Sequence, residues 1–405
     1  MDPLNIMLNL EQVIPYYQPI ISADTQLVIG YEVSAYYKSD EEDIQDLDWF
    51  FNDDTIPDEF KIELTTIIHQ KAIEDFIKTN HSLIFLKYNA KLLYKDNGET
   101  FLRLLETYAE KGLDYKKIVL ELKETDIMEE MDSLRHLLKY LKTFGIQIAL
   151  DDVGQRNGNL ERLVSLKPNI VKLDVQFLKE NELPHLYDDV HLSLSKLSRK
   201  IGATLLFKGV STYNQLNYAW RNGGRYYQGS YLKPANPEFA REDCCKKQIQ
   251  RDFQLFVSFE RKKLKAQVEL TNWINNQFNT ILQNINSEEA YDQIITKVGH
   301  ACHEFVFRVY MTNEEGVQLS SNAEKDHNDK WTLHEEGKEK NWSWRPYFFE
   351  NIARMNVEKR GILSDLYTDI TRHEQIRTFS FPLTKTSYIF LDIPYDYLFE
   401  QEGLL

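Results

Sequence analysis

The chain has 405 residues, 42% of them hydrophobic and 27% charged, which is typical of a globular protein with room for two or three domains. Its 48 Lys and Arg residues against 63 Asp and Glu residues give a formal charge of −15. Without a segregated basic patch, this balance excludes a protein that follows nucleic-acid phosphates or an anionic membrane. A small anionic ligand remains compatible, because a local field or a bound metal can override the net charge.

The cysteines and the N-terminus bear on the compartment. Cys244, Cys245 and Cys302 have no zinc-ligand spacing, and adjacent cysteines rarely pair with each other. The first residues include no basic segment, and no apolar run reaches about 18 residues. We therefore expect a cytoplasmic protein that binds neither membrane nor nucleic acid.

Strand-like and helix-like segments alternate from about residue 15 to 235. Apolar runs typical of strands are residues 28–31, 83–88, 118–120, 146–150, 170–173, 204–207 and 226–228. The amphipathic helical stretches between them include residues 59–78, 99–111, 130–143 and 192–201. This alternation predicts an α/β fold with a parallel sheet, and its length suits a closed (β/α)8 barrel of the TIM type. An open doubly wound sheet is the alternative.

Polar residues stand at the ends of these strand-like runs. They are Glu32, Lys87, Asn89, Glu121, Asp151, Lys172, Lys208 and Gln228. In a barrel the strand ends converge on one face, where active sites are built. The adjacent carboxylates Asp151 and Asp152 are costly to hold together unless a cation or a proton lies between them. Because the candidate ligands are hard oxygen atoms, we predict a Mg²⁺, Mn²⁺ or Ca²⁺ site rather than a zinc site.

The same residues stand in motifs that resemble those of EAL domains. Residues 17–20 (YQPI) and 30–33 (GYEV) resemble the family's YQPI and GYEAL opening, and residues 121–125 (ELKET) are similar to ELTES. Residues 151–154 (DDVG) resemble DDFG, 172–174 (KLD) resemble KID, and 228–229 (QG) with Pro234 resemble the closing QGY…P. The match covers roughly residues 10–240. It implies a barrel that binds cyclic di-GMP and, when active, hydrolyses it with Mg²⁺ or Mn²⁺; Ca²⁺ could occupy the site without supporting turnover.

The resemblance also implies roles for residues. Glu32, Glu121 and Asp151 would hold a first metal, and Asp152 would help to bind a second. In the family the fourth ligand is an asparagine at a strand end. Alignment on the following alanine puts Lys87 there and a shift of two puts Asn89 there; we favour Asn89, because an ammonium group does not ligate a cation. The implied catalytic residues are Glu32, Asp152 and Lys172, the implied loop anchor is Glu124, and the implied ligand contacts are Gln18, Pro19, Glu32, Asp152, Lys172, Gln228 and Gly229.

Several positions depart from the family pattern. Residues 155–159 (QRNGN) replace the family's small, hydroxyl-bearing loop, and Lys208 and Ser211 replace the two acidic residues of AEGVET. Tyr36 stands where the family has an arginine that meets the ligand phosphate, and Ser230 ends the QGY motif. We therefore predict a cyclic di-GMP receptor with weak or no hydrolysis. The alternatives are an active phosphodiesterase that produces linear pGpG, and a protein-interaction scaffold with a vestigial pocket.

The second half divides into a helical stretch and a mixed region. Residues 238–286 contain neither glycine nor proline and carry an apolar stripe, which predicts a helical linker that packs on the barrel, joins a homodimer or folds back as a hairpin. Residues 287–405 predict an α+β domain, with a hairpin of residues 306–311 and 317–321, later strands at 377–381 and 387–393, and helices at 287–304 and 346–355. The predicted domains are therefore residues 1–237, 238–286 and 287–405.

The order of elements in this last region resembles PAS/Cache sensor domains attached to some EAL proteins. Such domains cup a small ligand against the sheet. Our candidates for the pocket are Arg345, Tyr347, Asp365 and Tyr367, with aromatic core residues and one salt bridge as the alternative. The resemblance implies an unknown small ligand that modulates the barrel.

Overall fold

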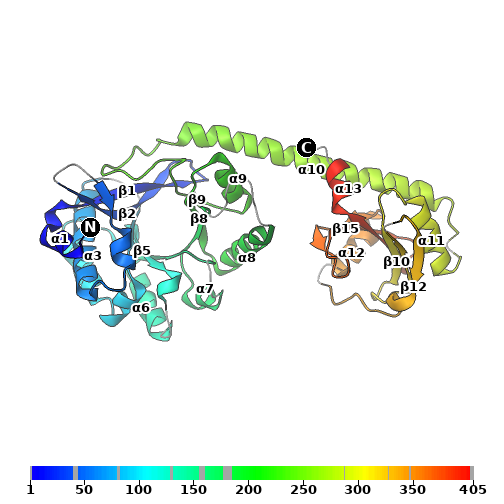
Figure 1. Ribbon diagram of the computed structural model, residues 1–405, viewed down its shortest axis with the longest axis horizontal. Helices are drawn as coiled ribbons and strands as arrows, with labels where there is room; N and C mark the ends of the chain where they lie inside the picture. The colour runs from blue at the N-terminus through cyan, green and yellow to red at the C-terminus, as the bar shows by residue number, and fades with distance from the viewer. Residues whose placement is uncertain are drawn as a thin grey trace. The chain divides into compact units, whose positions relative to one another are not determined.

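The structure is a computed structural model of the whole chain. It describes residues 2–39, 44–79, 83–127, 131–154, 160–176, 185–286, 288–326, 328–345 and 348–401. Two compact units divide the chain, Met1–Phe256 and Val257–Leu405, and each is described by itself (Figure 1).

Eight strands close into a barrel in the first unit. They are β1 (Val13–Ser22), β2 (Val28–Lys38), β4 (Ile84–Lys87), β5 (Ile118–Lys123), β6 (Gln147–Asp151), β7 (Ile170–Asp174), β8 (Thr204–Lys208) and β9 (Tyr226–Tyr227). Because β1 pairs with both β2 and β9, the sheet has no opening, and the short β3 (Ile44–Asp46) only extends it beyond β2. The barrel prediction is confirmed, and the open doubly wound sheet is excluded.

The strand β1 differs from the rest of the barrel. The strands from β2 through β4 and on to β9 pair in parallel along the barrel, whereas β1 is antiparallel to both of its neighbours. β1 was not among the strand-like runs recognised in the sequence. It contains Pro15 and Pro19, which have no N–H to donate and are unusual inside a sheet. The N–H of Tyr17, which lies between the two prolines, donates to the Asn236 carbonyl at 2.8 Å and so points away from β2. Because Pro15 and Pro19 are two residues on either side of Tyr17, their nitrogens also point away from β2, and the lack of an N–H loses no hydrogen bond to that strand.

Helices surround the barrel, as Figure 1 shows for α3, α6, α7 and α8. The helices and 3-10 turns of this part of the chain are α1 (Pro3–Leu8), η1 (Leu10–Gln12), α2 (Asp48–Asn52), α3 (Asp58–Phe76), α4 (Ala90–Lys95), α5 (Glu99–Ala109), η2 (Tyr115–Lys117), η3 (Glu124–Asp126), α6 (Met131–Thr143), α7 (Leu160–Leu166), α8 (His185–Ile201) and α9 (Tyr213–Arg221). The long α10 (Lys246–Leu282) begins against this unit, where Ile249 and Phe256 join its core.

The barrel interior is filled by one layer of apolar side chains. Ile20, Phe85, Val119, Ala149, Ile170 and Leu206 form this cluster. Their sequence neighbours, such as Ile84 and Leu86, belong instead to the large outer core beneath the helices. This alternation follows from the strand pleat, which sends successive side chains to opposite faces. It also decides which residues reach the mouth of the barrel.

The second unit is an antiparallel sheet with helices. Its order is β12-β11-β10-β16-β15-β13, and β14 pairs with β15. The strands are β10 (Arg308–Asn313), β11 (Asn322–Lys325), β12 (Trp331–His334), β13 (Ile362–Leu363), β14 (Tyr367–Thr368), β15 (Gln375–Pro382) and β16 (Ser387–Pro394). The helical elements are α11 (Tyr291–Ala301), η4 (Glu335–Gly337), α12 (Phe348–Glu358) and α13 (Tyr395–Gln401). The α+β prediction for this region is confirmed.

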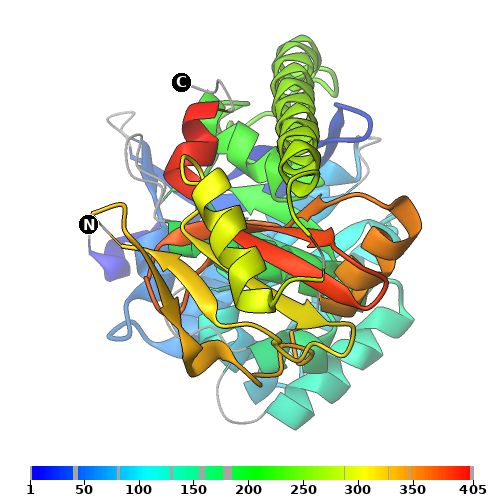
Figure 2. The ribbon, with the colours of Figure 1, turned by 90° about the vertical axis from the view of Figure 1, so that its right-hand side faces the viewer.

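The sheet of the second unit is covered on both faces. Val309 and Met311 pack in one core with the α11 residues Ile294 and Val298, and Figure 2 shows α11 lying across that face. Tyr310, between them in sequence, packs on the opposite face with residues of α12. The predicted hairpin is confirmed only in part. Residues 317–321 form no regular strand, but Gln318 makes an antiparallel bridge to Thr312 and the Leu319 N–H donates to the Met311 carbonyl at 2.8 Å. At its other end β10 pairs with β11. In that connection the buried Ser320 hydroxyl accepts the N–H of Met311 at 2.9 Å.

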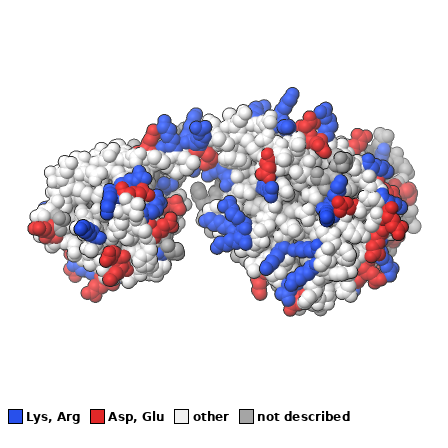
Figure 3. All heavy atoms as spheres, turned by 180° about the vertical axis from the view of Figure 1, so that it is seen from behind, with Lys and Arg blue, Asp and Glu red and all other residues white. Residues whose placement is uncertain are grey.

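The surface charge of both units is mixed (Figure 3). In Figure 3 both units carry acidic and basic side chains on the face that is drawn. Within the described ranges, each helix is either too short or too polar to cross a membrane.

Candidate ligand site at the barrel mouth

The polar residues of the mouth form a second layer above the apolar one. Each lies two positions beyond an inward-facing residue at the carboxyl end of its strand, so the pleat turns it inward as well. These residues are Lys87, Glu121, Asp151, Lys172, Lys208 and Gln228. The antiparallel β1 contributes Gln18, two positions before Ile20, and Gln18 pairs directly with Glu32 of β2. The convergence expected for the strand ends is therefore present.

Two carboxylates share the ammonium group of Lys172. This lysine is fully buried, and its Nζ donates to Glu121 Oε2 at 2.6 Å and to Glu32 Oε2. Glu32 and Glu121 are themselves 6% and 2% exposed. An ammonium in such surroundings is stable only because both carboxylates neutralise it.

Lys208 holds the two adjacent aspartates in the same way. Its Nζ lies 2.7 Å from Asp151 Oδ2 and 2.7 Å from Asp152 Oδ1. Asp152 adopts a left-handed backbone with φ of 56°, which aspartate tolerates better than most residues. The Lys208 ammonium therefore lies between Asp151 and Asp152, the adjacent carboxylates for which we expected a cation from the sequence.

The structure brings Lys87, and not Asn89, into the carboxylate cluster. Lys87 pairs in register with Glu121, and its Nζ lies 2.6 Å from Glu32 Oε1. Asn89 lies past the end of β4 and caps α4, where its Oδ1 accepts the N–H groups of Lys91 and Leu92 at 2.9 and 3.2 Å. Its amide donates to Asp126 at 3.0 Å. Lys87 therefore takes the place in the carboxylate cluster that we expected for Asn89, while Asn89 lines the same pocket from the start of α4.

Charge pairing shifts the acidities of the cluster. Burial by itself raises the pKa of Glu32, but the ammonium groups of Lys172 and Lys87 outweigh burial and hold this pKa well below its ordinary value. Burial likewise raises the pKa of Asp151, and Lys172 and Lys208 again outweigh it, so the pKa is lowered. Glu121 differs, because burial and the nearby Glu32 carboxylate raise its pKa to about 7. Protonation at the mouth therefore centres on Glu121.

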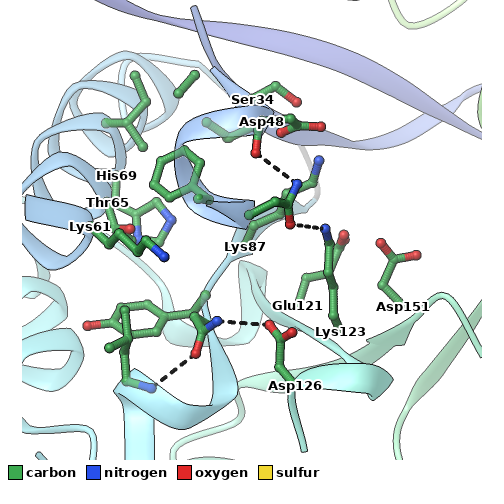
Figure 4. Close-up of a pocket in the computed structure, with 18 residues that line it drawn as sticks. Ser34, Asp48, Lys61, Thr65, His69, Lys87, Glu121, Lys123, Asp126 and Asp151 are labelled. Carbon is green, nitrogen blue, oxygen red and sulfur yellow. Dashed lines mark hydrogen bonds between the residues drawn. The ribbon is translucent and has the colours of Figure 1, made fainter. Parts of the chain in front are cut away.

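Three oxygen atoms of the mouth are buried without a hydrogen-bond partner. They are Glu121 Oε1, Asp151 Oδ1 and Gln228 Oε1. Figure 4 shows Glu121 and Asp151 facing the pocket that Lys87 also lines. Among the described residues, acceptors of this kind can take a water molecule or a ligand atom as their partner.

Other expected ligand contacts are placed unequally. Gln228 Nε2 donates to Glu32 Oε2 at 2.8 Å and to Gln18 Oε1 at 3.4 Å, so these three residues form one edge of the mouth. Pro19 is corrected, because the pleat turns it to the face opposite Gln18, away from the barrel interior. Gly229 is required for packing, since an added Cβ would lie 2.0 Å from the Val210 carbonyl oxygen.

The loop after Asp152 is tied to Glu124. This buried carboxylate accepts the backbone N–H of Gly154 through Oε2 at 3.3 Å. Residues 155–159, which replace the family's hydroxyl-bearing loop, lie outside the described residues. Tyr36, at the family's arginine position, stacks on Tyr16 with ring centroids 4.1 Å apart.

The residues at the mouth do not fit a cation-binding centre as they stand. Among the described residues, no group of three or more His, Cys, Asp or Glu side chains could hold a metal ion. The carboxylates gather, but the ammonium groups of Lys87, Lys172 and Lys208 take up Glu32 and one oxygen each of Glu121 and Asp151. A divalent cation that uses Glu32 as well as the remaining oxygens, Glu121 Oε1 and Asp151 Oδ1, has to displace an ammonium group.

The second unit has a pocket on the α12 face of its sheet. Arg345 and Tyr367 line it, as expected for a sensor pocket. Asp365 is corrected, because it is exposed and does not line the pocket, and Tyr347 lies outside the described residues. The acidic lining comes instead from Glu324, Glu336, Asp369 and Asp392. The sequence did carry a signal for Asp392, which is a charged residue within the apolar run of β16.

Comparison with known proteins matches both units. The EAL domain family matches residues 2–235, and the family described as EAL-domain associated signalling protein domain matches residues 239–405. The uncharacterized EAL-domain containing protein YkuI of Bacillus subtilis (strain 168) is 41% identical over 408 residues, covering 100% of both proteins. A crystal structure of YkuI in complex with substrate c-di-GMP and calcium has a TM-score of 0.94 and also covers 100% of both chains. The cyclic di-GMP phosphodiesterase PdeA of Borreliella burgdorferi is 30% identical over 122 residues, which are 29% of this chain and 18% of PdeA.

Proposed function

The chain belongs to the EAL-domain family, and from that premise we propose that it is a cyclic di-GMP receptor with weak or no phosphodiesterase activity. The ligand is supported by the YkuI complex, whose protein resembles this one over its full length. The lack of turnover is supported by one observation: Lys208 Nζ lies 2.7 Å from both Asp151 and Asp152.

Binding and hydrolysis make different demands on this site. Binding a cyclic dinucleotide needs donors for its phosphates and polar edges for its bases, and the ammonium groups and the Gln18–Gln228 edge supply such atoms. Hydrolysis needs a water molecule held in line with the phosphorus and polarised in the transition state. Lys208 occupies the oxygen atoms that could orient that water, so we expect the ligand to remain intact.

The calcium of the YkuI complex supports a divalent cation beside the ligand in this family. Glu121 and Asp151 would contact such a cation here through their remaining oxygens, and Glu32 would join them once an ammonium group is displaced. Mg²⁺ and Mn²⁺ are the ions that would polarise a phosphate oxygen for turnover.

A hydrolysis time course on labelled cyclic di-GMP tests the proposal. It is run with Mg²⁺ and with Mn²⁺ beside a binding isotherm of the same preparation. We expect saturable binding and no more than trace pGpG, and turnover at ordinary enzyme rates contradicts the proposal. The competing function, an active phosphodiesterase, is favoured by the unpartnered oxygens of Glu121 and Asp151, and the same time course decides between them.

The remaining expectations concern assembly and regulation. We propose a cytoplasmic homodimer whose PAS-like second domain modulates the barrel through α10. Leu264 and Val268 on α10 are 58% and 59% exposed, which supports a further contact along this helix. A small ligand of the second domain must then change the affinity for cyclic di-GMP by the same factor by which cyclic di-GMP changes the affinity for that small ligand. Absence of this coupling in calorimetry contradicts the proposal. Sedimentation of the Leu264→Glu variant tests the dimer.

A further inference from the structure

We infer that the ammonium groups of Lys87 and Lys208, beside that of Lys172, take the place of divalent cations at the barrel mouth, so that cyclic di-GMP binds without a metal ion. The inference rests on the proposed function for its ligand. Its claim about cations concerns only the chain's own side chains and can be measured separately.

The first step is the charge balance of the cluster. The cluster contains four formal negative charges, on Glu32, Glu121, Asp151 and Asp152. Each of these carboxylates forms an ion pair with at least one lysine of the mouth. The three lysines bring three positive charges at 2.6–2.7 Å from these oxygens. Little negative charge is left to attract a divalent cation, because each added positive charge lowers the local potential.

The second step is that the ammonium groups are fixed in place. Each is carried by a strand whose pleat aims it into the mouth, and Lys172 is 0% exposed. A tethered cation is present at high effective concentration and needs no binding from solution. A metal ion that displaced Lys172 would leave that ammonium group buried without its partner, which is costly.

The third step is the comparison with the family motifs. The resemblance places asparagine at Lys87 and an acidic residue at Lys208. Asparagine to lysine adds one positive charge, and an acidic residue to lysine adds two. Together the two replacements bring in more charge than one divalent cation supplies.

The exposure of the lysines assigns their roles. Lys87 and Lys208 have side chains that are 33% and 20% exposed, so a bound ligand can reach their ammonium groups. Lys172 is fully buried and neutralises the carboxylates around it, with direct ion pairs to Glu32 and Glu121. A cyclic dinucleotide carries two phosphate diesters, and the two accessible ammonium groups are the donors available to them.

The test uses the full-length protein in two measurements. The first is the thermal unfolding midpoint of the ligand-free protein in EDTA and in millimolar CaCl₂ or MnCl₂. The second is the cyclic di-GMP isotherm under the same conditions. For the unchanged chain we expect no shift of the midpoint by either salt, and a Kd that changes by less than about twofold.

The informative variant is Lys87→Asn/Lys208→Glu, which restores the residue types of the family. We expect its midpoint to rise with CaCl₂ or MnCl₂ and its affinity to fall by at least about tenfold in EDTA. The matched control is Lys78→Asn/Lys95→Glu, which makes the same changes at two exposed, ion-paired lysines of the same unit. The control is expected to respond as the unchanged chain does.

The outcomes separate the two proposals. Cyclic di-GMP binding that the unchanged chain loses in EDTA overturns the inference and leaves the proposed function intact. Absence of binding under every condition overturns the proposed function, while the response of the ligand-free midpoint still decides the claim about cations. Should the double variant fail to fold, the EDTA and CaCl₂ measurements on the unchanged chain decide alone.

Discussion

Each of the two units buries a cluster of charged side chains, and the two clusters differ in how completely they are satisfied. In the second unit, Arg308 donates to Asp392 at 2.7 Å and to Asp369. The other oxygen of Asp392 accepts from Thr378 at 2.6 Å. The other oxygen of Asp369 accepts the backbone N–H groups of Thr371 and Arg372 at 3.0 and 2.8 Å. All four carboxylate oxygens are thus occupied from within the chain.

The cluster at the barrel mouth is left incomplete. Glu121 Oε1, Asp151 Oδ1 and Gln228 Oε1 are buried and have no partner. A complete buried network fixes a fold, whereas an incomplete one stays costly until something else fills it. The comparison therefore assigns a structural role to the Arg308 cluster and a binding role to the barrel mouth.

The largest expected effect tests the structural role. Arg308→Met leaves Asp369 and Asp392 buried without their cation, and we expect a loss of about 3–5 kcal/mol in the free energy of unfolding of the second unit. Chemical denaturation measures it. The control Arg360→Gln removes an exposed arginine paired with Glu358, and we expect less than about 1 kcal/mol. Equal losses in the two variants would remove the distinction drawn here.

The equivalent change in the barrel should behave differently. Lys172→Met leaves Glu32 and Glu121 without their shared ammonium, and we expect a loss of about 3 kcal/mol, at the low end for a broken buried pair. Because free oxygens already face this mouth, added CaCl₂ should restore part of the stability of Lys172→Met and none of that of Arg308→Met. Denaturation with and without the salt measures both, and equal recovery would contradict the comparison.

Acid should weaken the barrel through a histidine that takes no part in the site. Burial lowers the pKa of His191 from its ordinary 6.5 to about 4. The unfolded chain therefore binds this proton more readily, so the contribution is complete above pH 6.5 and is lost as the pH falls toward 4, by about 1.4 kcal/mol per pH unit. His191→Gln, which can keep a bond to the Tyr218 hydroxyl, should remove this part of the pH dependence. Parallel denaturation curves between pH 7 and 4.5 measure the difference; identical slopes would show that His191 is not the group.

The smallest effect separates stability from ligand affinity. Gln228→Leu removes the bonds to Glu32 and Gln18, and we expect a loss of about 1 kcal/mol in stability together with weaker cyclic di-GMP binding. Gln248→Leu removes a bond to the Tyr231 carbonyl on the far side of β9 and should cost similar stability with unchanged affinity. A joint fall of affinity in both variants would mean that Gln228 acts through the fold alone.

Much of the barrel was predictable from sequence because the strand period and the strand ends are local properties. Glu32, Glu121, Asp151 and Gln228 were placed by counting from apolar runs, and they meet as expected. The choice between Lys87 and Asn89 failed, because it depends on where β4 ends, and its last residue is Lys87. We favoured Asn89 because an ammonium group does not ligate a cation, whereas the pleat of β4 directs Lys87 into the mouth.

The misses in the second unit also have a physical origin. The arm placed at residues 317–321 meets the end of β10 only through the bridge of Gln318 to Thr312. The Gln318 and Ser320 side chains make their hydrogen bonds within the connection, and the regular strand forms later, at β11. Asp365 was expected in the pocket and Asp369 was not, although it is Asp369 that pairs with Arg308 and lines the pocket, beside the short pairing of β14 with β15. Such pairings join distant residues and leave no local signal.

The seam made by β1 has a consequence for the order in which the protein is completed. Gln18 and Gln228 meet across this seam although they are 210 residues apart in sequence. During synthesis the first strand waits for β9, and its edge stays unpaired on that side until most of the barrel has been made. Under the proposed function, cyclic di-GMP in contact with both glutamines would bind only the closed barrel, so its binding energy would add to the stability of the closed form.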